Sequence, residues 1–358
     1  MSKPDDFSFA PLRLCEHNFS RKGAKAQSEN PGLFKVMIKT FYQLSNMPDY
    51  KSLRIIFMGT PDFAVASLDE LVKAGCNIVA VITAPDKMAG RGMKVNESAV
   101  KKYAAEKGLS ILQPEKLKDP NFLEQLRSLK ADLQLVVAFR MLPEVVWNMP
   151  PLGTINLHGS LLPQYRGAAP INWAVINGET ETGVTTFKLQ QQIDTGNILL
   201  KDKMSIGENE TAGEIHDRMK IIGAQLLLKT VKGIADGSLQ EIPQPAVEES
   251  ALKHAPKIFT ETSNIDWNNP IDSIFNLIRG LSPFPAAFTY LDDKMLKIFS
   301  SHKEKVSISV EPGEYLTDKK TFLKFAGTDG FIHVDELQLE GKKRMKIGDF
   351  LRGYKFHQ

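Results

Sequence analysis

Cysteine is scarce in this sequence, and its scarcity argues against two kinds of site. The 358 residues include only two cysteines, Cys15 and Cys76. Two isolated cysteines supply neither a disulfide framework nor the clustered ligands of a structural metal site, and they suit a reducing compartment. No apolar run approaches the roughly 20 residues that a membrane-spanning helix needs. We therefore expect a cytoplasmic protein that binds no metal and does not associate with a membrane.

A large excess of charge of one sign is also lacking. Lys and Arg total 45 against 42 Asp and Glu, which gives a net charge of +3 at pH 7. Bulk charge therefore does not indicate a nucleic-acid-binding protein, and any such surface must be local. The chain is longer than one average domain, and its 42% of hydrophobic residues suffices for substantial cores. Two domains are the default expectation.

Residues 1–52 lack the sustained hydrophobic periodicity of a core-forming segment. They mix Ser, Lys, Asn and Pro, and they contain no apolar stretch of the kind found in a secretory signal. We predict a flexible N-terminal extension, in which Met47 is a candidate natural start.

Alternating strand and helix patterns begin at Leu53 and predict an α/β catalytic domain over residues 53–238. A buried strand at 53–58 leads into the turn Gly59–Asp62 and an amphipathic helix. We predict further strands at 77–83, 110–112 and 133–138, and helices at 97–107, 119–130 and 211–237. Such alternation favours a Rossmann-like, mostly parallel sheet. The first turn lacks the Gly-x-Gly-x-x-Gly pattern, which disfavours dinucleotide binding.

Polar reactive groups are concentrated in the segment Thr154–Pro170. Ile155 and Leu157 alternate with Asn156 and His158, so a strand here directs the amide and the imidazole to one face. The residues that follow are rich in Gly, Pro and Ala and predict an ordered loop at the carboxyl end of the strand, where open α/β sheets bind ligands. For His158 taken alone, a satisfied core histidine is the alternative.

A carboxylate that suits His158 lies in a second segment, Gln192–Gly196. Asp194 occupies a turn closed by Gly196, between strand-like patterns at 183–189 and 197–204. A carboxylate beside a histidine can orient the imidazole and favour its protonated form. Alone, Asp-Thr-Gly is a weak signal, because Asp and Gly are ordinary turn residues.

The two segments together resemble the 10-formyltetrahydrofolate-dependent transferase and hydrolase superfamily. The resemblance implies a catalytic triad made of Asn156, His158 and Asp194. It also implies that the formyl donor, 10-formyltetrahydrofolate, is bound by the loop residues Ser160, Leu161, Leu162 and Pro163. The run Tyr165–Pro170 is similar to the branch that formylates initiator methionyl-tRNA. The implied partners are that tRNA and the folate co-substrate, and we expect a monomer.

Residues 239–256 contain three prolines and little periodicity, and they predict a linker between domains. After it we predict a helix capped at Asn269 and then short strands, which suggest a small β-barrel domain over residues 257–358. The resemblance extends through Pro283–Pro285 and implies an OB-like domain that contacts tRNA. In the first domain, the apolar groups of Phe139–Pro143 are candidates for the wall of a pterin pocket.

Two basic regions are candidates for contact with RNA. One is the loop 84–94, where Arg91 lies between two glycines and Lys94 follows; an ordinary surface loop is the alternative. The other is the C-terminal stretch, whose local positive charge includes Lys342, Lys343, Arg344 and Lys346. Lysine clusters also serve solubility, so a solvated surface remains the alternative there.

The resemblance implies formyl transfer to the α-amino group of methionyl-tRNA, which supplies translation initiation. Asn156 and a protonated His158 are donors suited to a developing oxyanion, while Asp194 can orient His158 and help to take the amine proton. This chemistry needs no metal and no covalent enzyme intermediate. The first alternative is another enzyme of the superfamily, such as a nucleotide-sugar or purine-pathway formyltransferase or a hydrolase. The second is a non-catalytic RNA-binding module.

Overall fold

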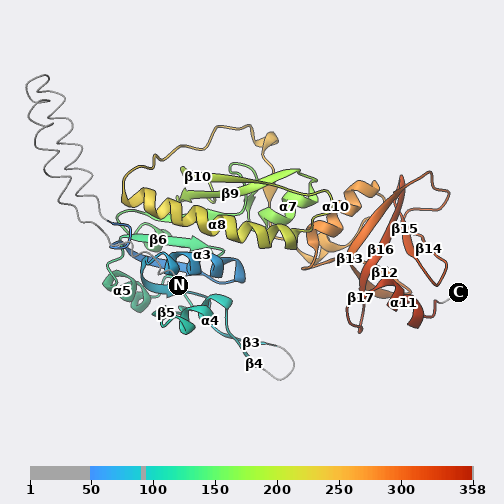
Figure 1. The fold of residues 1–358 in the computed structure, drawn as a ribbon, viewed down its shortest axis with the longest axis horizontal. Coiled ribbons are helices and arrows are strands. Elements are labelled where there is room, and N and C mark those ends of the chain that lie inside the picture. Colours follow the sequence, from blue (N-terminus) through green and yellow to red (C-terminus); the bar gives the residue numbers. More distant parts are fainter. Residues whose placement is uncertain (1–48, 90–93, 357–358) are drawn as a thin grey trace, which may run out of the picture.

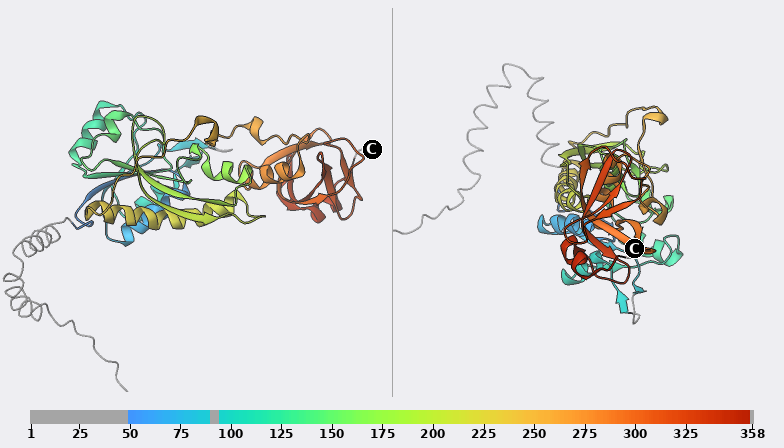
Figure 2. Two further views of the ribbon diagram at one scale, coloured as in Figure 1. Left: turned by 90° about the horizontal axis from the view of Figure 1, so that it is seen from above. Right: turned by 90° about the vertical axis from the view of Figure 1, so that its right-hand side faces the viewer.

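The computed structural model describes residues 49–89 and 94–356, which form two domains (Figure 1). Most of the predicted extension 1–52, and also Arg91, lie outside the described residues. Residues 49–52 form a turn, and Tyr50 packs against the first domain with its hydroxyl donating to the carbonyl of Ala74 at 3.1 Å. Seen from above, the molecule is elongated, with the C-terminal domain at one end (Figure 2).

A seven-stranded sheet in the order β10-β9-β7-β6-β1-β2-β5 forms the centre of the first domain. Its strands are β1 (Arg54–Gly59), β2 (Asn77–Ile82), β5 (Ile111–Leu112), β6 (Leu133–Val137), β7 (Thr154–His158), β9 (Glu181–Lys188) and β10 (Ile198–Ser205). The five strands from β7 to β5 run parallel, whereas β9 pairs antiparallel with both β7 and β10. The predicted mostly parallel, Rossmann-like sheet is confirmed.

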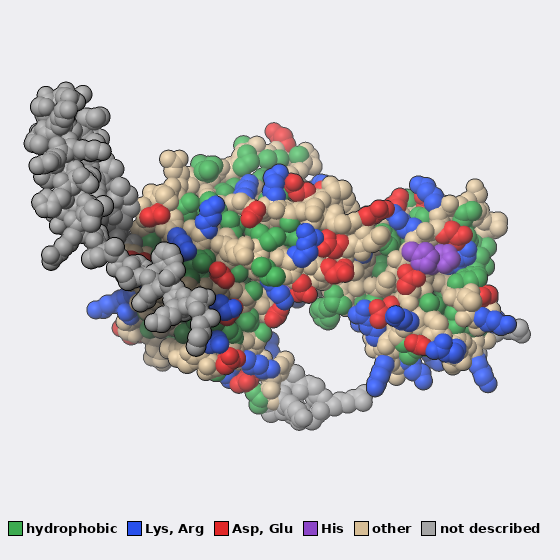
Figure 3. Space-filling view, viewed as in Figure 1, with side chains coloured by type: hydrophobic (Ala, Val, Ile, Leu, Met, Phe, Trp, Pro, Cys, Tyr) green, Lys and Arg blue, Asp and Glu red, His purple; other side chains and the backbone are tan. Residues whose placement is uncertain are grey.

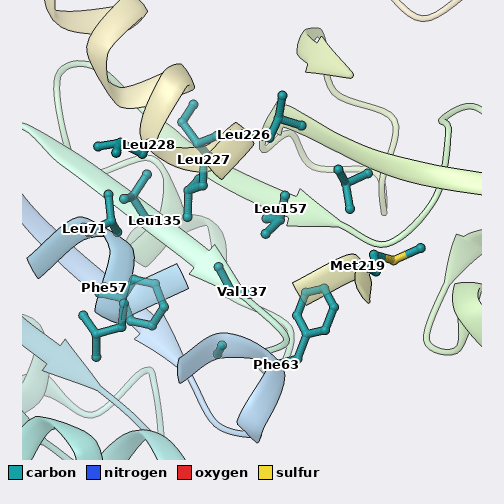
Figure 4. Packing of buried hydrophobic residues seen from close by; sticks show 14 of the residues in the cluster. Phe57, Phe63, Leu71, Leu135, Val137, Leu157, Met219, Leu226, Leu227 and Leu228 are labelled. Carbon is teal, nitrogen blue, oxygen red and sulfur yellow. The ribbon is translucent and has the colours of Figure 1, made fainter. Parts of the chain in front are cut away.

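Helices cover both faces of this sheet. One face packs against α3 (Asp62–Lys73), α4 (Ala99–Glu106), α7 (Pro170–Ile176) and α8 (Ala212–Ala235). The other packs against α5 (Pro120–Ser128) and α6 (Glu144–Trp147). Figure 4 shows Leu71 of α3 and Leu227 of α8 converging on Leu135 and Leu157 of the sheet. Fully burying a side chain of this size contributes about 1.5–3 kcal/mol, so the large apolar cluster fixes the sheet against both helices.

The long helix α8 begins where the sequence supplies a capping box. The Thr211 hydroxyl accepts from the backbone amide of Glu214, and the Glu214 carboxylate accepts from the backbone amide of Thr211. Two of the amides that a helix start leaves without a helical partner are thereby satisfied. The predicted helix over 211–237 is confirmed within two residues at its end.

The segment predicted as a basic loop contains a short hairpin. β3 (Lys87–Ala89) pairs antiparallel with β4 (Lys94–Asn96), and the hairpin projects away from the sheet (Figure 1). At its base, the Asp86 carboxylate accepts from Gln113 and pairs with Lys101. The expectation of a plain loop is therefore wrong for the described residues. Three-residue strands are too short to show a period of two.

The C-terminal domain is an antiparallel sheet wrapped around one helix. The strands run in the order β12-β13-β16-β15-β14, with β17 beside β16. Their bounds are β12 (Ala287–Leu291), β13 (Lys294–Lys305), β14 (Tyr315–Thr317), β15 (Leu323–Ala326), β16 (Gly330–Leu339) and β17 (Met345–Lys346). The helix α10 (Ile271–Leu281) fills the concave side and α11 (Ile347–Gly353) follows β17. The expected small, OB-like β domain is confirmed in the form of a half-barrel.

The start of α10 differs from its predicted cap. The helix begins at Ile271, one residue later than expected, and Pro270 rather than Asn269 occupies the cap position. The free amide of Ile271 donates to the Asp329 carboxylate at 2.8 Å, which replaces a local cap by a contact from far along the chain.

The segment predicted as a linker packs along the first domain. It contains the single-turn η1 (Glu249–Ala251) and β11 (His254–Ala255), and β11 pairs in parallel with β8 (Arg166–Gly167) from the loop after β7. A further turn, α9 (Thr260–Ser263), precedes α10. The chain therefore touches the loop after β7 before it enters the C-terminal domain.

The two domains meet where α10 crosses α7. The side-chain amide of Asn172 donates to the carbonyl of Gly280 at 2.7 Å, and Arg279 donates to the carbonyls of Gly207 and Glu210. A methyl group on Gly280 would lie 2.5 Å from the Ile176 side chain, so only glycine permits this approach. Burial lowers the pKa of the Arg279 guanidinium, whose hydrogen-bond partners among the described residues are these carbonyls and Asn276.

Candidate active site

The strand β7 carries two of the predicted catalytic side chains at the centre of the sheet. It lies between β6 and β9, where the parallel part of the sheet meets its antiparallel edge. Ile155 and Leu157 are buried in the cluster beneath α8, so Asn156 and His158 share the opposite face. Within the described residues, the Asn156 amide makes no hydrogen bond to protein and is only half-buried. It is free to donate to a ligand.

His158 has an oxygen atom near each of its ring nitrogens. Nε2 lies 2.8 Å from the carbonyl oxygen of Tyr165, and Nδ1 lies 3.9 Å from Oδ2 of Asp194. Because a carbonyl oxygen can only accept, Nε2 must carry a proton. In the neutral ring, Nδ1 would then present a lone pair to the carboxylate, whereas the imidazolium presents an N–H. Nε2 is therefore the ring nitrogen that donates within the protein, and Nδ1 is the one that faces the carboxylate.

Asp194 faces this histidine from the connection between β9 and β10. Its Oδ2 accepts from the backbone amide of Gly167 at 2.9 Å, and its backbone is left-handed, with φ of 53°. Gly196 closes the turn, because a Cβ there would lie 1.7 Å from the carbonyl oxygen of Lys188. The structure thus brings Asn156, His158 and Asp194 to one place, from segments that are about 40 residues apart.

Two residues of the predicted donor-binding run, Ser160 and Leu162, are turned inward. The Ser160 hydroxyl donates to the carbonyl of Gln164 at 2.6 Å, and Leu162 packs against Phe187 and Ile198. Both side chains are fully buried. Their contacts stabilise the conformation of the loop.

The other two, Leu161 and Pro163, are half-buried. Thr185 of β9 fixes the loop between them, because its hydroxyl donates to the carbonyl of Ser160 and accepts from the amide of Leu162. Contact of Ser160–Pro163 with the formyl donor stays a prediction.

The wall predicted for a pterin pocket lies at the carboxyl end of β6. The Arg140 guanidinium donates to the carbonyls of Pro114 and Glu115, and burial lowers its pKa. Met141 is 74% exposed beside it. Arg140 therefore ties the loop after β6 to the loop after β5 across the ends of β1 and β2.

Sequence reasoning missed a polar cluster that supports the carbonyl held by His158. The Tyr165 hydroxyl donates to Glu179, which also pairs with Lys253 of the predicted linker. Burial and the bond to Glu179 raise the pKa of Tyr165. Burial alone would raise the pKa of Glu179, but the hydrogen bonds from Lys253 and Tyr165 outweigh it and lower that pKa below 4.5. The pattern gave no signal, since Lys253 is 74 residues from Glu179.

Lys253→Met should lower the melting temperature at neutral pH by removing the partner of the Glu179 carboxylate. A depressed carboxyl pKa stabilises the fold above its unfolded value, and that stability is lost as the pH falls through the folded value. The difference between wild type and Lys253→Met should therefore vanish at pH values well below 4.5. Thermal melts across this range, with the exposed Lys229→Met as control, provide the measurement. An equal difference at neutral and acidic pH would contradict the assignment.

The predicted RNA-contacting residues lie apart from the triad. Lys94 begins β4 of the hairpin, whose tip with Arg91 is outside the described residues. In the C-terminal domain, Lys342, Lys343, Arg344 and Lys346 are all exposed. Figure 3 shows lysine and arginine side chains gathered along the lower edge of this domain. Arg344 differs from the other three because it pairs with Glu336 at 2.5 Å and lies over the Phe299 ring.

A cleft of about 740 Å³ opens between the domains. Its walls include Ile171 and Asn172 of α7, the start of α8 with His216, and Pro283, Phe284 and Arg344 of the C-terminal domain. The notch between the two bodies is visible in Figure 3. Sequence alone gave His216 no role, and the structure makes it part of this wall, 5.3 Å from the Phe63 ring. A cleft that forms only when two domains pack has no local sequence signature.

Family models match both domains of the chain. A family model described as "Formyl transferase" matches residues 53–231, and one described as "Formyl transferase, C-terminal domain" matches residues 257–355. The chain belongs to the formyl transferase family. This family transfers formyl groups from formyltetrahydrofolate, which gives the polar groups at the end of β7 a reaction in which to take part.

Similar proteins in the family cover both domains. The methionyl-tRNA formyltransferase of Bacteroides fragilis is 53% identical over 310 residues, which are 85% of this chain and 96% of that protein. The protein of the same name from Phocaeicola vulgatus is 56% identical over 313 residues, 85% of this chain and 97% of the relative.

Two solved structures share the fold. An N-formyltransferase from Helicobacter canadensis, in complex with folinic acid and dTDP-3-aminofucose, has a TM-score of 0.61 at 20% identity, covering 82% of this chain and 100% of its own. HypX from Aquifex aeolicus, in complex with tetrahydrofolic acid, has a TM-score of 0.58 at 18% identity, covering 85% of this chain and 48% of its own.

Metal-binding clusters and membrane-spanning helices are both absent from the described residues. No group of three or more His, Cys, Asp or Glu side chains there is arranged to hold a metal ion. In the same part of this formyl transferase, every helix is too short or too polar to cross a membrane.

Proposed function

We propose that the acceptor of the formyl group is the α-amino group of initiator methionyl-tRNA, so that the product serves translation initiation. The main support is the 53% identity to a methionyl-tRNA formyltransferase across 85% of the chain, both domains included. Because charged tRNA is used in translation, we also propose a cytoplasmic enzyme, and we propose separately that it acts as a monomer.

The site residues suit attack of an amine on a formyl carbon. A free α-amino group has a pKa of about 7.7–8.0, so much of it must lose a proton before it can attack at neutral pH. When bound, 10-formyltetrahydrofolate supplies the activated carbon. The unpaired Asn156 amide fits a donor that faces an oxygen on which negative charge develops.

His158 and Asp194 divide the proton work. An imidazolium at His158 would stabilise negative charge on the same oxygen through its charge, because its Nε2–H donates to the Tyr165 carbonyl, and the Asp194 carboxylate lies 3.9 Å from its Nδ1. With its second oxygen the carboxylate can accept the proton that the amine releases. Asp194 therefore has both an orienting and a proton-accepting role.

Charge in the C-terminal domain is proposed to bind tRNA phosphates. The triple variant Lys342→Gln, Lys343→Gln, Lys346→Gln should raise KM for tRNA and leave kcat near the wild-type value. Its log–log salt slope should fall by about one for each lysine that contacts a phosphate. Arg344 is kept, because it pairs with Glu336.

A matched control neutralises three exposed lysines elsewhere in the same domain, Lys294, Lys319 and Lys320. Kinetics for tRNA at several salt concentrations should separate the two triple variants. If both keep the wild-type salt slope, the basic cluster has no phosphate role.

The proposed acceptor is tested by formyl transfer from 10-formyltetrahydrofolate with purified protein. Methionyl-tRNA should be formylated much faster than an amino sugar nucleotide or glycinamide ribonucleotide, and donor hydrolysis without acceptor should be slow. Preferred formylation of a small amine, or fast hydrolysis, would assign the chain to another activity of the family. Tight tRNA binding without turnover would leave only an RNA-binding role.

A further inference from the structure

One glutamine of the segment between the domains reaches into the catalytic turn. The side-chain amide of Gln244 donates to the carbonyl of Asp194 at 2.8 Å and to the carbonyl of Gly196 at 2.9 Å. Its oxygen accepts from Arg166 at 2.7 Å. Both amide hydrogens and the oxygen are therefore engaged by residues that surround the triad.

The backbone around Gln244 leaves this side chain as the inward contact. Gln244 is half-buried, whereas its neighbours Pro243 and Pro245 are exposed. Neither proline has a backbone N–H, so neither can donate a backbone hydrogen bond to the catalytic domain. Just before them, Ile242 exchanges two backbone hydrogen bonds with Ile198 at the start of β10. The chain is thus anchored within the turn that carries Asp194 and again just after it, at Ile198.

Asp194 needs such an anchor more than an ordinary turn residue does. Its left-handed backbone is uncommon for a residue with a side chain, and its carboxylate must stay near both the Gly167 amide and His158. Without the two bonds from Gln244, the backbone of Asp194 could relax from its left-handed conformation, which would reorient the Cβ relative to β9 and move the carboxylate. Gln244 resists that relaxation.

We propose that Gln244 is a positioning residue for formyl transfer, which holds the 194–196 backbone so that the Asp194 carboxylate faces His158. It acts through Asp194 and does not touch the reacting atoms. The role rests on the proposed function. In this role, the segment that joins the two domains also helps to position a residue of the site.

Two replacements separate the donors of Gln244 from its acceptor. Gln244→Met keeps the length of the side chain and removes all three hydrogen bonds. Gln244→Glu keeps the acceptor for Arg166 and removes both donors to the turn. Each should lower kcat by roughly 10- to 100-fold, as expected when a catalytic group is misplaced, and leave KM for both substrates near the wild-type value. Gln240→Met, at an exposed glutamine of the same segment, should match wild type.

A double-mutant cycle tests the path of the effect. If Gln244 acts through Asp194, then Gln244→Met should lower kcat little further in an Asp194→Asn background. Two losses that multiply fully would overturn the proposal, as would a Gln244→Glu variant with wild-type kcat, because the Arg166 contact would then suffice. Thermal melts identify a misfolded variant, and in that case Gln244→Glu decides.

The wild-type protein is assayed with methionyl-tRNA in parallel. An active wild type with unimpaired Gln244 variants overturns the role of Gln244 alone. A wild type without formyl transfer to methionyl-tRNA overturns the proposed function and this role together.

Discussion

Replacing Asn156 with alanine is expected to lower kcat for formyl transfer by roughly 10²- to 10³-fold, the usual effect of losing one donor to a developing oxyanion. The Asn156 amide lies on the same face of β7 as His158 and, among the described residues, has no protein partner to satisfy. Its loss should therefore cost little stability. Steady-state kinetics with saturating methionyl-tRNA and 10-formyltetrahydrofolate give kcat directly.

The control for this variant is Asn148→Ala, the same change at an exposed asparagine after α6. It should leave kcat unchanged. A folded Asn156→Ala protein with near-normal kcat would show that Asn156 has no catalytic role. A rise in KM for the donor at constant kcat would assign it to binding instead.

Replacing Asp194 with asparagine should lower kcat by roughly 10²- to 10⁴-fold, the range typical for loss of a positioned acid or base. Asparagine has nearly the same shape, and its side-chain oxygen can still accept the hydrogen bond that the Gly167 amide donates to Oδ2 of Asp194 at 2.9 Å. It cannot stabilise a charged His158 or take a proton from the amine. The fold should survive while the chemistry fails.

Asp293→Asn provides the matched control, because Asp293 also has a left-handed backbone and lies exposed in the turn between β12 and β13. Its melting temperature and kcat should stay near those of the wild type. If Asp194→Asn and Asp293→Asn have equal kcat, the carboxylate opposite His158 is not part of the mechanism.

The sequence predicted the fold well where local periodicity and packing agree. The strand Leu133–Val137 reads as a buried apolar run and is fully buried at the centre of the sheet. The start of α8 follows from Thr211 and Glu214, which are three residues apart. The prediction for the cap of α10 was wrong because the Ile271 amide donates to Asp329, 58 residues further on, and a local rule had assigned the acceptor to Asn269.

The site shows the same division between local and distant information. Asn156 and His158 follow from strand alternation, and the family resemblance connected them to Asp194. The sequence did not predict the contacts that hold these residues in place, because Gln244 is 50 residues from Asp194. Nothing in the neighbourhood of a glutamine between two prolines indicates which carbonyl it will find.

Gly280 sets the width of the passage between the domains. Its missing side chain lets α10 lie directly against Ile176, and the cleft opens beside that contact. A single added methyl group would clash with Ile176 and push α10 away from α7. The close approach at Gly280 therefore limits how far apart the two walls lie, and with it the size of molecule that can touch both at once.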